Sequence, residues 1–221
     1  MIRGGLTIIM RLGITREEEI LEMSTKKRAA VIIHVKRITL AVFLALAGMQ
    51  SPARAQETIP FVPSPMPVVQ RMLEVAEFKN GDVLYDMGSG DGRIVIQAAK
   101  KYGVRGVGVD LNPELVEKAR ANAIQEGVGD LVEFRAADGL TVDISEATVV
   151  TLYMFKWFNN QLRPKLQKLK PGSRIIAHDF DIDDWKPTRV EYVNPSESGS
   201  SEFSEPRTLY IWKIDPPAPA P

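Results

Sequence analysis

The chain contains no cysteine and only two histidines, His34 and His178. The lack of cysteine excludes a disulfide framework, a zinc–thiolate site and a cysteine nucleophile. Two histidines are too few for a His-rich metal site, although carboxylates could still bind a hard cation, and we assign no metal-binding residues. Basic and acidic residues balance at 28 each, so the formal net charge is zero. Without a basic excess we expect no nucleic-acid partner.

The N-terminal part of the chain has the pattern of an export signal. Basic residues flank an apolar run at residues 38–48, and Ala53-Arg54-Ala55 supplies small residues at the spacing of a cleavage site. As a helix the run would span roughly 16 Å, against about 30 Å for the apolar core of a bilayer. We therefore predict that residues 1–56 form an extension that carries a signal peptide or a membrane anchor.

Other interpretations of this extension stay open. An uncleaved segment would associate with the membrane through residues 29–49, whereas a cleaved one would direct export to the periplasm. A segment without this function, for example a buried helix of the domain, would leave the protein in the cytoplasm. The true start is open too, since Met1, Met10 and Met23 are all plausible.

Residues 57–214 are predicted to form one α/β domain, followed by a disordered Pro-rich tail at residues 215–221. Alternating helix and strand patterns indicate a mostly parallel sheet with helices on both faces. Pro164 is expected to kink or begin the last helix, and residues 194–206 to form a hairpin loop. The expected helices cover residues 66–78, 92–102, 112–126 and 158–169, and the expected strands cover residues 83–87, 106–110, 131–135, 147–153, 174–178, 188–193 and 207–214.

A glycine-rich turn joins the first expected strand to the second expected helix. Gly88, Gly90 and Gly92 allow the backbone to approach a ligand closely, and the N-terminus of the next helix favours anionic groups. A dinucleotide fingerprint beginning at Gly88 would need a glycine at position 93, where Arg93 stands instead. The spacing, with Asp86 before it, favours S-adenosylmethionine (SAM). An NAD-dependent oxidoreductase is the more distant alternative.

Acidic residues follow three successive expected strands at one edge of the sheet. Asp86 ends the first strand, where a carboxylate can receive the ammonium group of a methionine moiety. Asp110 ends the second, where a carboxylate can accept both ribose hydroxyls. Asp138 follows the third and can accept a hydrogen bond from the adenine amino group. Each residue alone could serve only a turn, but this order and spacing indicate SAM.

These segments resemble the first three motifs of the class I SAM-dependent methyltransferases: residues 86–92, 108–113 and 137–139. The resemblance implies a Rossmann-like fold, with a seven-stranded, mostly parallel sheet that has one antiparallel strand and helices on both faces. We expect the following residues to bind SAM: Phe61, Pro63, Ser64, Asp86, Gly88, Ser89, Gly90, Asp91, Gly92, Asp110, Leu111, Ala137 and Asp138.

A narrower resemblance lies upstream of the glycine-rich turn. Residues 59–65, followed by residues 68–73, are similar to the pre-motif segment of the ATP-synthase c-subunit lysine methyltransferase family and its prokaryotic relatives. In that family a Tyr-Val-Pro-Thr-Pro element helps to close the cofactor site. Here Phe61 stands in place of the tyrosine and Ser64 in place of the threonine. The resemblance implies a protein lysine as the methyl acceptor.

Methyl transfer from a sulfonium requires alignment, desolvation and a neutral nucleophile. The acceptor side is expected after the strand at residues 147–153, where our candidates are Tyr153, Phe155, Trp157 and Asn159. The Asp/Asn-Pro-Pro-aromatic pattern of adenine-methylating enzymes is absent there. Alternatives to a lysine methyltransferase are a small-molecule methyltransferase on the same scaffold and a SAM-binding module without catalysis.

Tyr153 and His178 are the catalytic candidates. His178 ends the fifth expected strand and could act as a general base, although a histidine there could equally be structural. Asp181, Asp183 and Asp184 cluster nearby. They could attract a cationic acceptor, but we favour a solvated loop.

Overall fold

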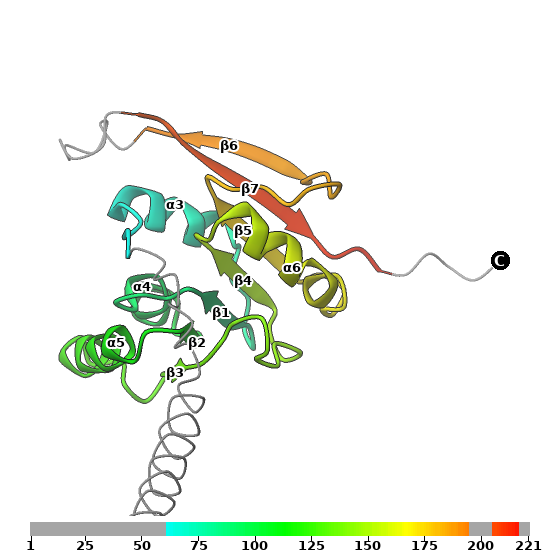
Figure 1. Cartoon of the computed structure of the whole chain (residues 1–221). Coiled ribbons are helices and arrows are strands. Elements are labelled where there is room, and N and C mark those ends of the chain that lie inside the picture. The colour runs from blue at the N-terminus through cyan, green and yellow to red at the C-terminus, as the bar shows by residue number, and fades with distance from the viewer. Residues whose placement is uncertain (1–60, 195–204, 217–221) are drawn as a thin grey trace, which may run out of the picture. The chain divides into compact units, whose positions relative to one another are not determined.

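The computed structural model describes residues 61–194 and 205–216, which form a seven-stranded sheet in the order β3-β2-β1-β4-β5-β7-β6 (Figure 1). The strands are β1 (Val83–Met87), β2 (Arg105–Asp110), β3 (Val132–Ala136), β4 (Val149–Leu152), β5 (Arg174–His178), β6 (Arg189–Val193) and β7 (Arg207–Lys213). The helices in these ranges are α3 (Met66–Val75), α4 (Arg93–Tyr102), α5 (Pro113–Gln125) and α6 (Lys156–Leu166).

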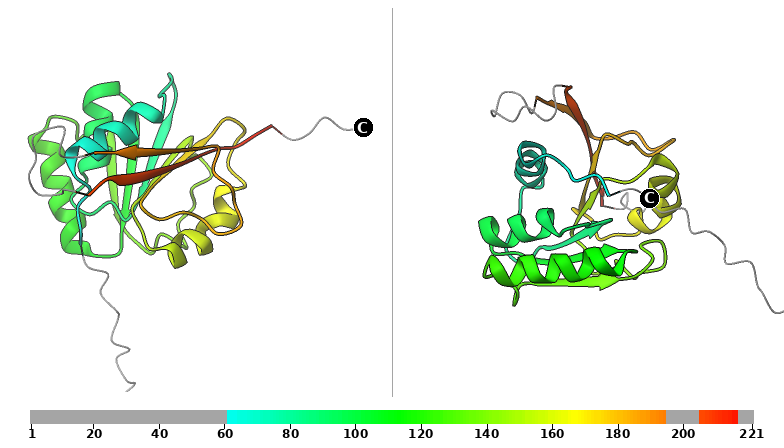
Figure 2. Two further views of the ribbon diagram at one scale, coloured as in Figure 1. Left: turned by 90° about the horizontal axis from the view of Figure 1, so that it is seen from above. Right: turned by 60° about the vertical axis from the view of Figure 1, so that its left-hand side comes forward.

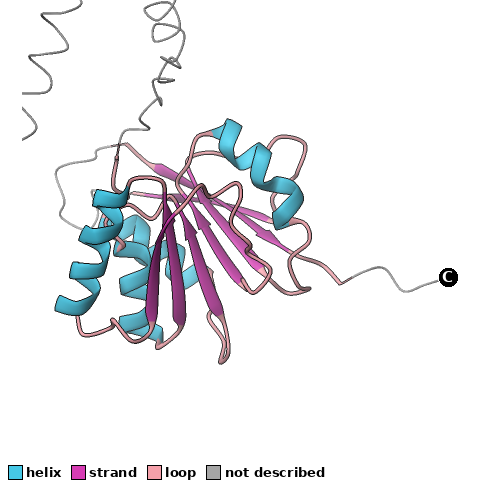
Figure 3. Cartoon of the chain, turned by 60° about the horizontal axis from the view of Figure 1, so that its bottom comes forward, coloured by secondary structure: helices cyan, strands magenta, loops and turns pink. Residues whose placement is uncertain are grey.

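Strand direction agrees with the sequence-based expectation. Neighbouring strands are parallel from β3 through β5, and β7 is antiparallel to both β5 and β6. Within the described ranges, β7 is thus the single strand that runs against the others (Figure 3). The prediction of a mostly parallel sheet with one antiparallel strand is confirmed.

Helices cover both faces of the sheet, as Figure 2 shows. Buried residues of α3, α4 and α5 join one hydrophobic cluster with Leu84, Val149 and Ile176, whereas those of α6 join a second cluster with Tyr85 and Leu152. Because successive strand residues point to opposite faces, each central strand contributes to both clusters. The sheet is therefore buried on both sides, and only its edges and loops can receive a ligand.

Local signals explain where the helices begin and end. The side chain of Asn112 accepts a hydrogen bond from the backbone N–H of Glu114, and Pro113 opens α5, as a capped helix requires. Gly103 ends α4 with φ +65° and donates its N–H to the carbonyl of Ala99. The start of α5 and the end of α4 thus follow from residues adjacent in the sequence.

Some expected boundaries were wrong. The last helix begins at Lys156 and ends at Leu166, whereas we expected residues 158–169. Pro164 does not start this helix but lies in its final turns. A proline is tolerated there because it removes only one backbone hydrogen bond, close to the helix end. The expected strand at residues 147–153 shortens to β4, because Ala147 closes a turn by donating to the carbonyl of Ile144.

Other expectations concern residues without a description. The extension at residues 1–56, most of the hairpin loop and residues 217–221 of the tail lie outside the described ranges. In the part of the chain that the structure describes, no helix is long and apolar enough to cross a membrane. The domain limits of 57 and 214 stay predictions.

A buried ion pair fixes the amino end of the sheet. Arg174 at the start of β5 donates two hydrogen bonds to Asp82, at 2.5 and 3.1 Å, and others to the carbonyls of Ala76 and Glu77 behind α3. Asp82 also accepts from the hydroxyl of Thr148, at 2.7 Å. Burial opposes ionisation of Asp82, but the bonds from Arg174 and Thr148 hold its pKa below the ordinary value. The pair thus ties α3, β1, β4 and β5 together.

Replacing Arg174 by leucine should lower the free energy of unfolding by about 3–5 kcal/mol at pH 7, because Asp82 keeps its buried charge without a partner. Since the pKa of Asp82 is lowered in the folded protein, the ion pair stabilises the fold above the unfolded pKa, and this gain is lost as the pH falls. The difference between wild type and variant should therefore shrink below about pH 4. Urea denaturation at several pH values measures it.

The double variant Arg174→Leu with Asp82→Asn is the control. It removes both charges together, so it should be more stable than Arg174→Leu alone. Equal stability of the two variants at pH 7 would argue against an uncompensated charge as the cause.

Candidate active site

The glycine-rich loop between β1 and α4 has the backbone that only glycine adopts easily. Gly88, Gly90 and Gly92 have φ values of +82°, +53° and +80°. The amides of Gly88 and Ser89 donate to the carbonyl of Val109, at 2.8 and 3.0 Å, so the loop folds back onto the end of β2. The loop is therefore fixed by the neighbouring strand before any ligand binds.

Asp110 joins the loops that follow β1 and β2. One carboxylate oxygen accepts from the amide of Gly90 at 2.8 Å, and the other accepts from the amide of Asn112 at 2.9 Å. A carboxylate oxygen can accept more than one hydrogen bond, so these contacts leave room for ribose hydroxyls. The ligand role of Asp110 stays a prediction, and sequence reasoning did not anticipate this structural role.

Asp86, at the end of β1, is the least satisfied charged group of the site. Asp86 is only 2% exposed. One carboxylate oxygen accepts a hydrogen bond from the hydroxyl of Thr151 at 2.7 Å, and the other oxygen has no hydrogen-bond partner. Burial raises the pKa of Asp86 to about 7, against the opposing effect of Thr151, and Asp110 and Asp91 add to the rise. The hydroxyl of Ser89 is likewise buried and without a partner. Such unsatisfied groups fit a site that a cationic, hydrogen-bonding ligand completes.

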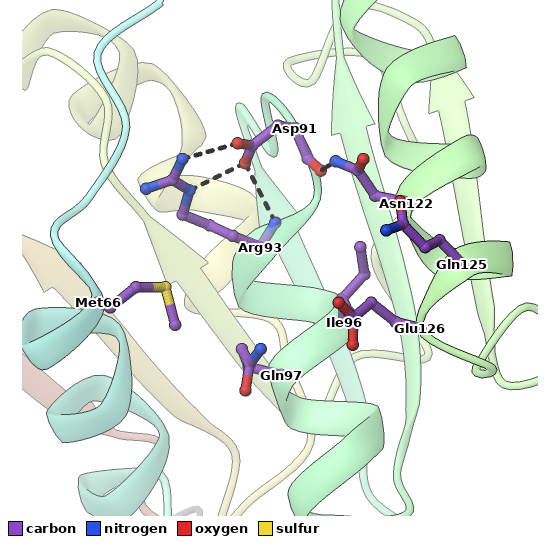
Figure 4. A pocket seen from close by; sticks show the side chains of 8 residues that line it. All are labelled: Met66, Asp91, Arg93, Ile96, Gln97, Asn122, Gln125 and Glu126. Atoms are coloured by element: carbon purple, nitrogen blue, oxygen red, sulfur yellow. Dashed lines mark hydrogen bonds and ion pairs between the residues drawn. The ribbon is translucent and has the colours of Figure 1, made fainter.

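Asp91 has a structural role in the glycine-rich loop. Its carboxylate accepts two hydrogen bonds from the guanidinium of Arg93, at 2.9 and 2.7 Å, and its carbonyl accepts from the side chain of Asn122 (Figure 4). Burial opposes ionisation, but the Arg93 bonds hold the pKa of Asp91 below its usual range. The carboxylate thus braces the loop, and a contact of Asp91 with the cofactor stays a prediction.

The pocket drawn in Figure 4 lies beside the contact between Asp91 and Arg93. It has a volume of about 230 Å³, and neither Asp86 nor Asp110 lines it. Its lining residues come from the start of α3 and from α4 and α5, with Asp91 of the loop. Of the residues predicted to bind SAM, Asp91 is the one that lines this pocket, so the pocket does not outline the predicted cofactor site.

The pre-motif segment packs directly on the glycine loop. The ring of Phe61 lies so close to Gly90 that a Cβ atom there would be 2.3 Å from the ring. Arg93 donates a hydrogen bond of 3.0 Å to the carbonyl of Ser64, and the ammonium of Lys118 lies 5.9 Å from the centre of the Phe61 ring. Two contacts thus place Phe61 and Ser64 over the loop, as the resemblance implied.

His178 is buried beneath this segment, with no exposed surface. A 2.9 Å hydrogen bond joins its Nδ1 to the hydroxyl of Ser64, and its ring stacks on Tyr153 with 3.9 Å between centroids. Its Nε2 lies 3.4 Å from a carboxylate oxygen of Asp179 but makes no hydrogen bond. Burial lowers the pKa of His178 to about 4, so the ring is neutral near pH 7. The imidazole is thus buried and hydrogen-bonded within the chain, as an orienting side chain would be, and its role as a general base stays a prediction.

Aromatic rings gather where β4 and β5 end. The ring of Tyr153 lies 6.3 Å from that of Phe180, and Phe155 meets Phe180 edge-on at 5.6 Å. Phe155 is 40% exposed and Trp157 is 49% exposed, so both are accessible to an acceptor. Asn159 is instead fully buried and donates to the carbonyl of Phe180 at 3.0 Å, which makes it a support for this group.

Sequence reasoning missed two residues of the site. Phe180 joins the aromatic group, and its position two residues after His178 was the available signal. Met154 covers the loop: a Cβ atom on Gly88 would lie 2.3 Å from its sulfur. Nothing in the local pattern marked Met154, because this contact depends on how the ends of β1 and β4 meet.

Asp181 and Asp183, after β5, are paired within the chain. The ammonium of Lys156 lies 2.9 Å from Asp181 and 2.6 Å from Asp183. Asp184 contributes only its backbone carbonyl, which accepts a hydrogen bond from Arg163 at 3.1 Å. These contacts agree with the solvated loop that we favoured.

The predicted adenine side lies at the ends of β2 and β3. Leu111 is exposed, and Ala137 is partly buried. Asp138 accepts the amide N–H of Leu140 at 2.9 Å and thus begins a turn, while its side chain stays exposed. Contacts of these residues with a cofactor remain predictions.

Replacing Gly90 by alanine should weaken SAM binding strongly. The new Cβ would collide with Phe61, and the left-handed backbone adds roughly 1–2 kcal/mol of strain. Gly103→Ala is the matched control, because Gly103 also has positive φ but has open space around its Cβ position. Isothermal calorimetry should show SAM binding lost or much weakened in Gly90→Ala and retained in Gly103→Ala. Equal affinities would contradict the packing of Phe61 on the loop.

Known proteins share these features. Residues 86–189 match the ANTKMT methyltransferase domain family. A protein-lysine N-methyltransferase of Saccharolobus islandicus is 46% identical over 158 residues, which cover 71% of this chain and 94% of that protein. The ATP-synthase c-subunit lysine N-methyltransferase of Homo sapiens is 36% identical over 152 residues, covering 68% of this chain and 64% of that protein.

A solved structure is similar as well. A Salinibacter ruber protein, described as an RNA methyltransferase in complex with S-adenosyl-L-homocysteine, is 50% identical with a TM-score of 0.63, and the match covers 72% of this chain and 98% of that one. The fold, the loop with its unsatisfied carboxylate and these relatives agree. The chain is a SAM-dependent methyltransferase with a class I fold, and it belongs to the family that contains the ATP-synthase c-subunit lysine methyltransferases and their prokaryotic relatives.

Proposed function

We propose that this enzyme transfers the methyl group of SAM to the side-chain amine of a protein lysine. The observation that carries the proposal is the aromatic group of Tyr153, Phe155 and Phe180 at the ends of β4 and β5. Aromatic faces attract an alkylammonium through cation–π contacts, and their apolar surroundings favour its neutral form. The names of the relatives from Saccharolobus islandicus and Homo sapiens support the same acceptor.

Loss of the lysine proton is the main obstacle to this reaction. A lysine side chain in water has a pKa near 10.4, so the neutral amine costs about 4–5 kcal/mol at pH 7. His178 is buried and has a lowered pKa, so it offers no accessible base. Desolvation against the aromatic rings would lower the lysine pKa instead, with the proton released to water. Tyr153 would then serve to position the amine.

For the cofactor, we propose that the free oxygen of Asp86 receives the ammonium of the methionine moiety. Asp110 would accept the ribose hydroxyls, and Asp138 the adenine amino group. The unsatisfied oxygen of Asp86 and the unsatisfied hydroxyl of Ser89 support this arrangement. Bound SAM supplies an electrophilic methyl group, and the chain supplies its orientation.

The affinity for SAM should depend on pH through Asp86. Because the pKa of Asp86 in the cofactor-free protein is about 7 and the ammonium favours its charged form, binding should release a proton below that pH. The affinity should fall by up to about tenfold per pH unit below about 7 and level off above it. Calorimetry in buffers of different ionisation enthalpy measures the proton release.

Asp86→Asn provides the control. It should bind SAM more weakly and with little pH dependence between pH 5 and 8. Because the pKa of Asp86 is raised in the folded state, the cofactor-free wild type loses stability as the pH rises from about 4 to about 7, and the variant should lose less. An unchanged pH profile of SAM binding in the variant would rule out Asp86 as the titrating group.

An RNA acceptor is the second candidate, favoured by the description of the Salinibacter ruber relative as an RNA methyltransferase. Exposed aromatic rings can stack on bases as well as hold an alkylammonium. The zero net charge of the chain argues against it, since RNA binding draws on a basic surface.

Radiolabelled SAM and a lysate of the source cells separate the candidates. Protein-lysine methylation predicts label that survives nuclease, is lost with protease and maps to methyl-lysine by mass spectrometry. Label that is lost with nuclease would favour RNA, and label only in small solutes would favour a small-molecule acceptor. SAM binding without any label transfer would favour a non-catalytic module.

Removing an acceptor-side ring tests the aromatic group. Phe155→Ala should lower kcat/KM for the labelled acceptor about twofold to fivefold while SAM affinity stays near wild type, since a lost cation–π contact at a partly exposed ring costs about 0.5–1 kcal/mol. Tyr192→Ala is the control, because Tyr192 is 76% exposed on β6 and contacts none of these rings in the aromatic pairs of the described residues. Equal activity of the two variants would place the acceptor elsewhere.

For location, we propose that residues 26–55 act as an uncleaved membrane anchor. SAM is made in the cytosol, so an anchor keeps the domain with its cofactor, whereas export would separate them. The basic flank and apolar run support this proposal. Membrane fractionation with N-terminal sequencing tests it, and a mature chain that starts near Gln56 would show cleavage.

A further inference from the structure

We propose that Ser64 and His178 form a latch that holds the pre-motif segment over the cofactor loop and links cofactor binding to the orientation of Tyr153. In this proposal His178 is a positioning residue. The inference rests on SAM binding by the chain and not on the identity of the methyl acceptor.

Ser64 connects two distant parts of the fold through different atoms. Its carbonyl accepts the hydrogen bond from Arg93, which is itself held by Asp91 of the glycine loop. Its hydroxyl shares the hydrogen bond with Nδ1 of His178, 114 residues away at the end of β5. One residue thus joins the loop after β1 to the carboxyl end of β5.

The environment makes the hydroxyl contact costly to lose. Ser64 is 4% exposed and His178 is fully buried, so neither group can turn to bulk water in exchange. The other nitrogen of His178 is already without a hydrogen-bond partner. Loss of the Ser64 hydroxyl would leave both ring nitrogens unsatisfied in a dry site, which is unfavourable.

The same imidazole carries the link to the acceptor side. Tyr153 stacks on His178 at 3.9 Å with an interplanar angle of 26°, and Tyr153 directly follows β4. The neighbouring Asp179 has φ +61°, a conformation unusual for aspartate, and its carboxylate is held by Arg207 at 2.9 Å. The end of β5 is thus fixed, so a movement of Ser64 reaches Tyr153 through the imidazole ring.

Closure over the cofactor gives this link its function. Phe61, three residues before Ser64, lies on Gly90 of the cofactor loop. A ligand that settles on the loop and moves Phe61 therefore also acts on Ser64, and through His178 on Tyr153. Cofactor binding and acceptor alignment would then be coupled through one hydrogen bond.

A pair of isosteric variants tests the hydroxyl. Ser64→Thr keeps the hydroxyl, and Ser64→Val has the shape of the threonine variant but lacks the hydroxyl. Both β-branched residues suit the extended backbone that precedes a proline. Ser64→Val should bind SAM about fivefold to tenfold more weakly, as for one lost buried hydrogen bond, while Ser64→Thr should bind within about twofold of wild type. Calorimetry gives the affinities, and thermal melting confirms that each variant is folded.

Ser173→Ala separates the latch from a general effect of losing a buried serine hydroxyl. Ser173 is 2% exposed and lies immediately before β5, at the opposite edge of the sheet from Ser64. Its substitution should change the melting temperature at most and leave SAM affinity unchanged. If Ser64→Val and Ser64→Thr bind SAM equally well, the latch is wrong.

A second measurement follows His178 itself. The chain has two histidines, so NMR of the imidazole protons gives few signals, and a His34→Gln variant identifies the one from His178. Stacking on Tyr153 should displace this signal, and addition of SAM should move it in wild type and Ser64→Thr but not in Ser64→Val. A His178 signal that ignores bound SAM in the wild type would overturn the coupling. Absence of any SAM binding by wild type would instead overturn the cofactor assignment, and the latch with it.

Discussion

The parallel direction of β3, β2, β1, β4 and β5 is the constraint on which the site depends. Parallel strands bring all their carboxyl ends to one edge. The ends of β1, β2 and β5 carry Asp86, Asp110 and His178, and Tyr153 directly follows β4. These residues are spread over 93 positions of the sequence, from 86 to 178. The sheet brings them together without a contribution from any single loop.

At this edge the structure contains backbone conformations and a buried charge that are locally unfavourable. The loop holds three residues in left-handed backbone, and Asp86 is buried with one oxygen unsatisfied. A carboxylate that is easily protonated when the site is empty is a poor stabiliser of the fold, but it is well prepared for a cation. Unsatisfied buried charges of this kind are more typical of binding sites than of protein cores, because buried polar groups in a core are hydrogen-bonded.

The sequence was sufficient for much of this arrangement because the strongest signals are local. Glycine at positions with positive φ, the capped start of α5 and the acidic residues after the strands each follow from short patterns. The direction of β7 was anticipated only through the family resemblance. What could not be read is how side chains from distant segments meet: the Arg93 brace on Asp91, Met154 over Gly88 and the burial of Asn159. The sequence shows that His178 ends a strand, but only the packing shows that no solvent reaches its ring.

The ion pair between Arg174 and Asp82 has a consequence for how such proteins diversify. It closes the sheet at the edge opposite the one that carries the cofactor and acceptor residues. The stabilising ion pair and the acceptor-side rings thus lie at opposite edges of the sheet. Substitution of the rings therefore need not disturb the ion pair that holds the strands together. A lineage built in this way can acquire new methyl acceptors while its scaffold is inherited unchanged, which suits a family whose relatives are named for different acceptors.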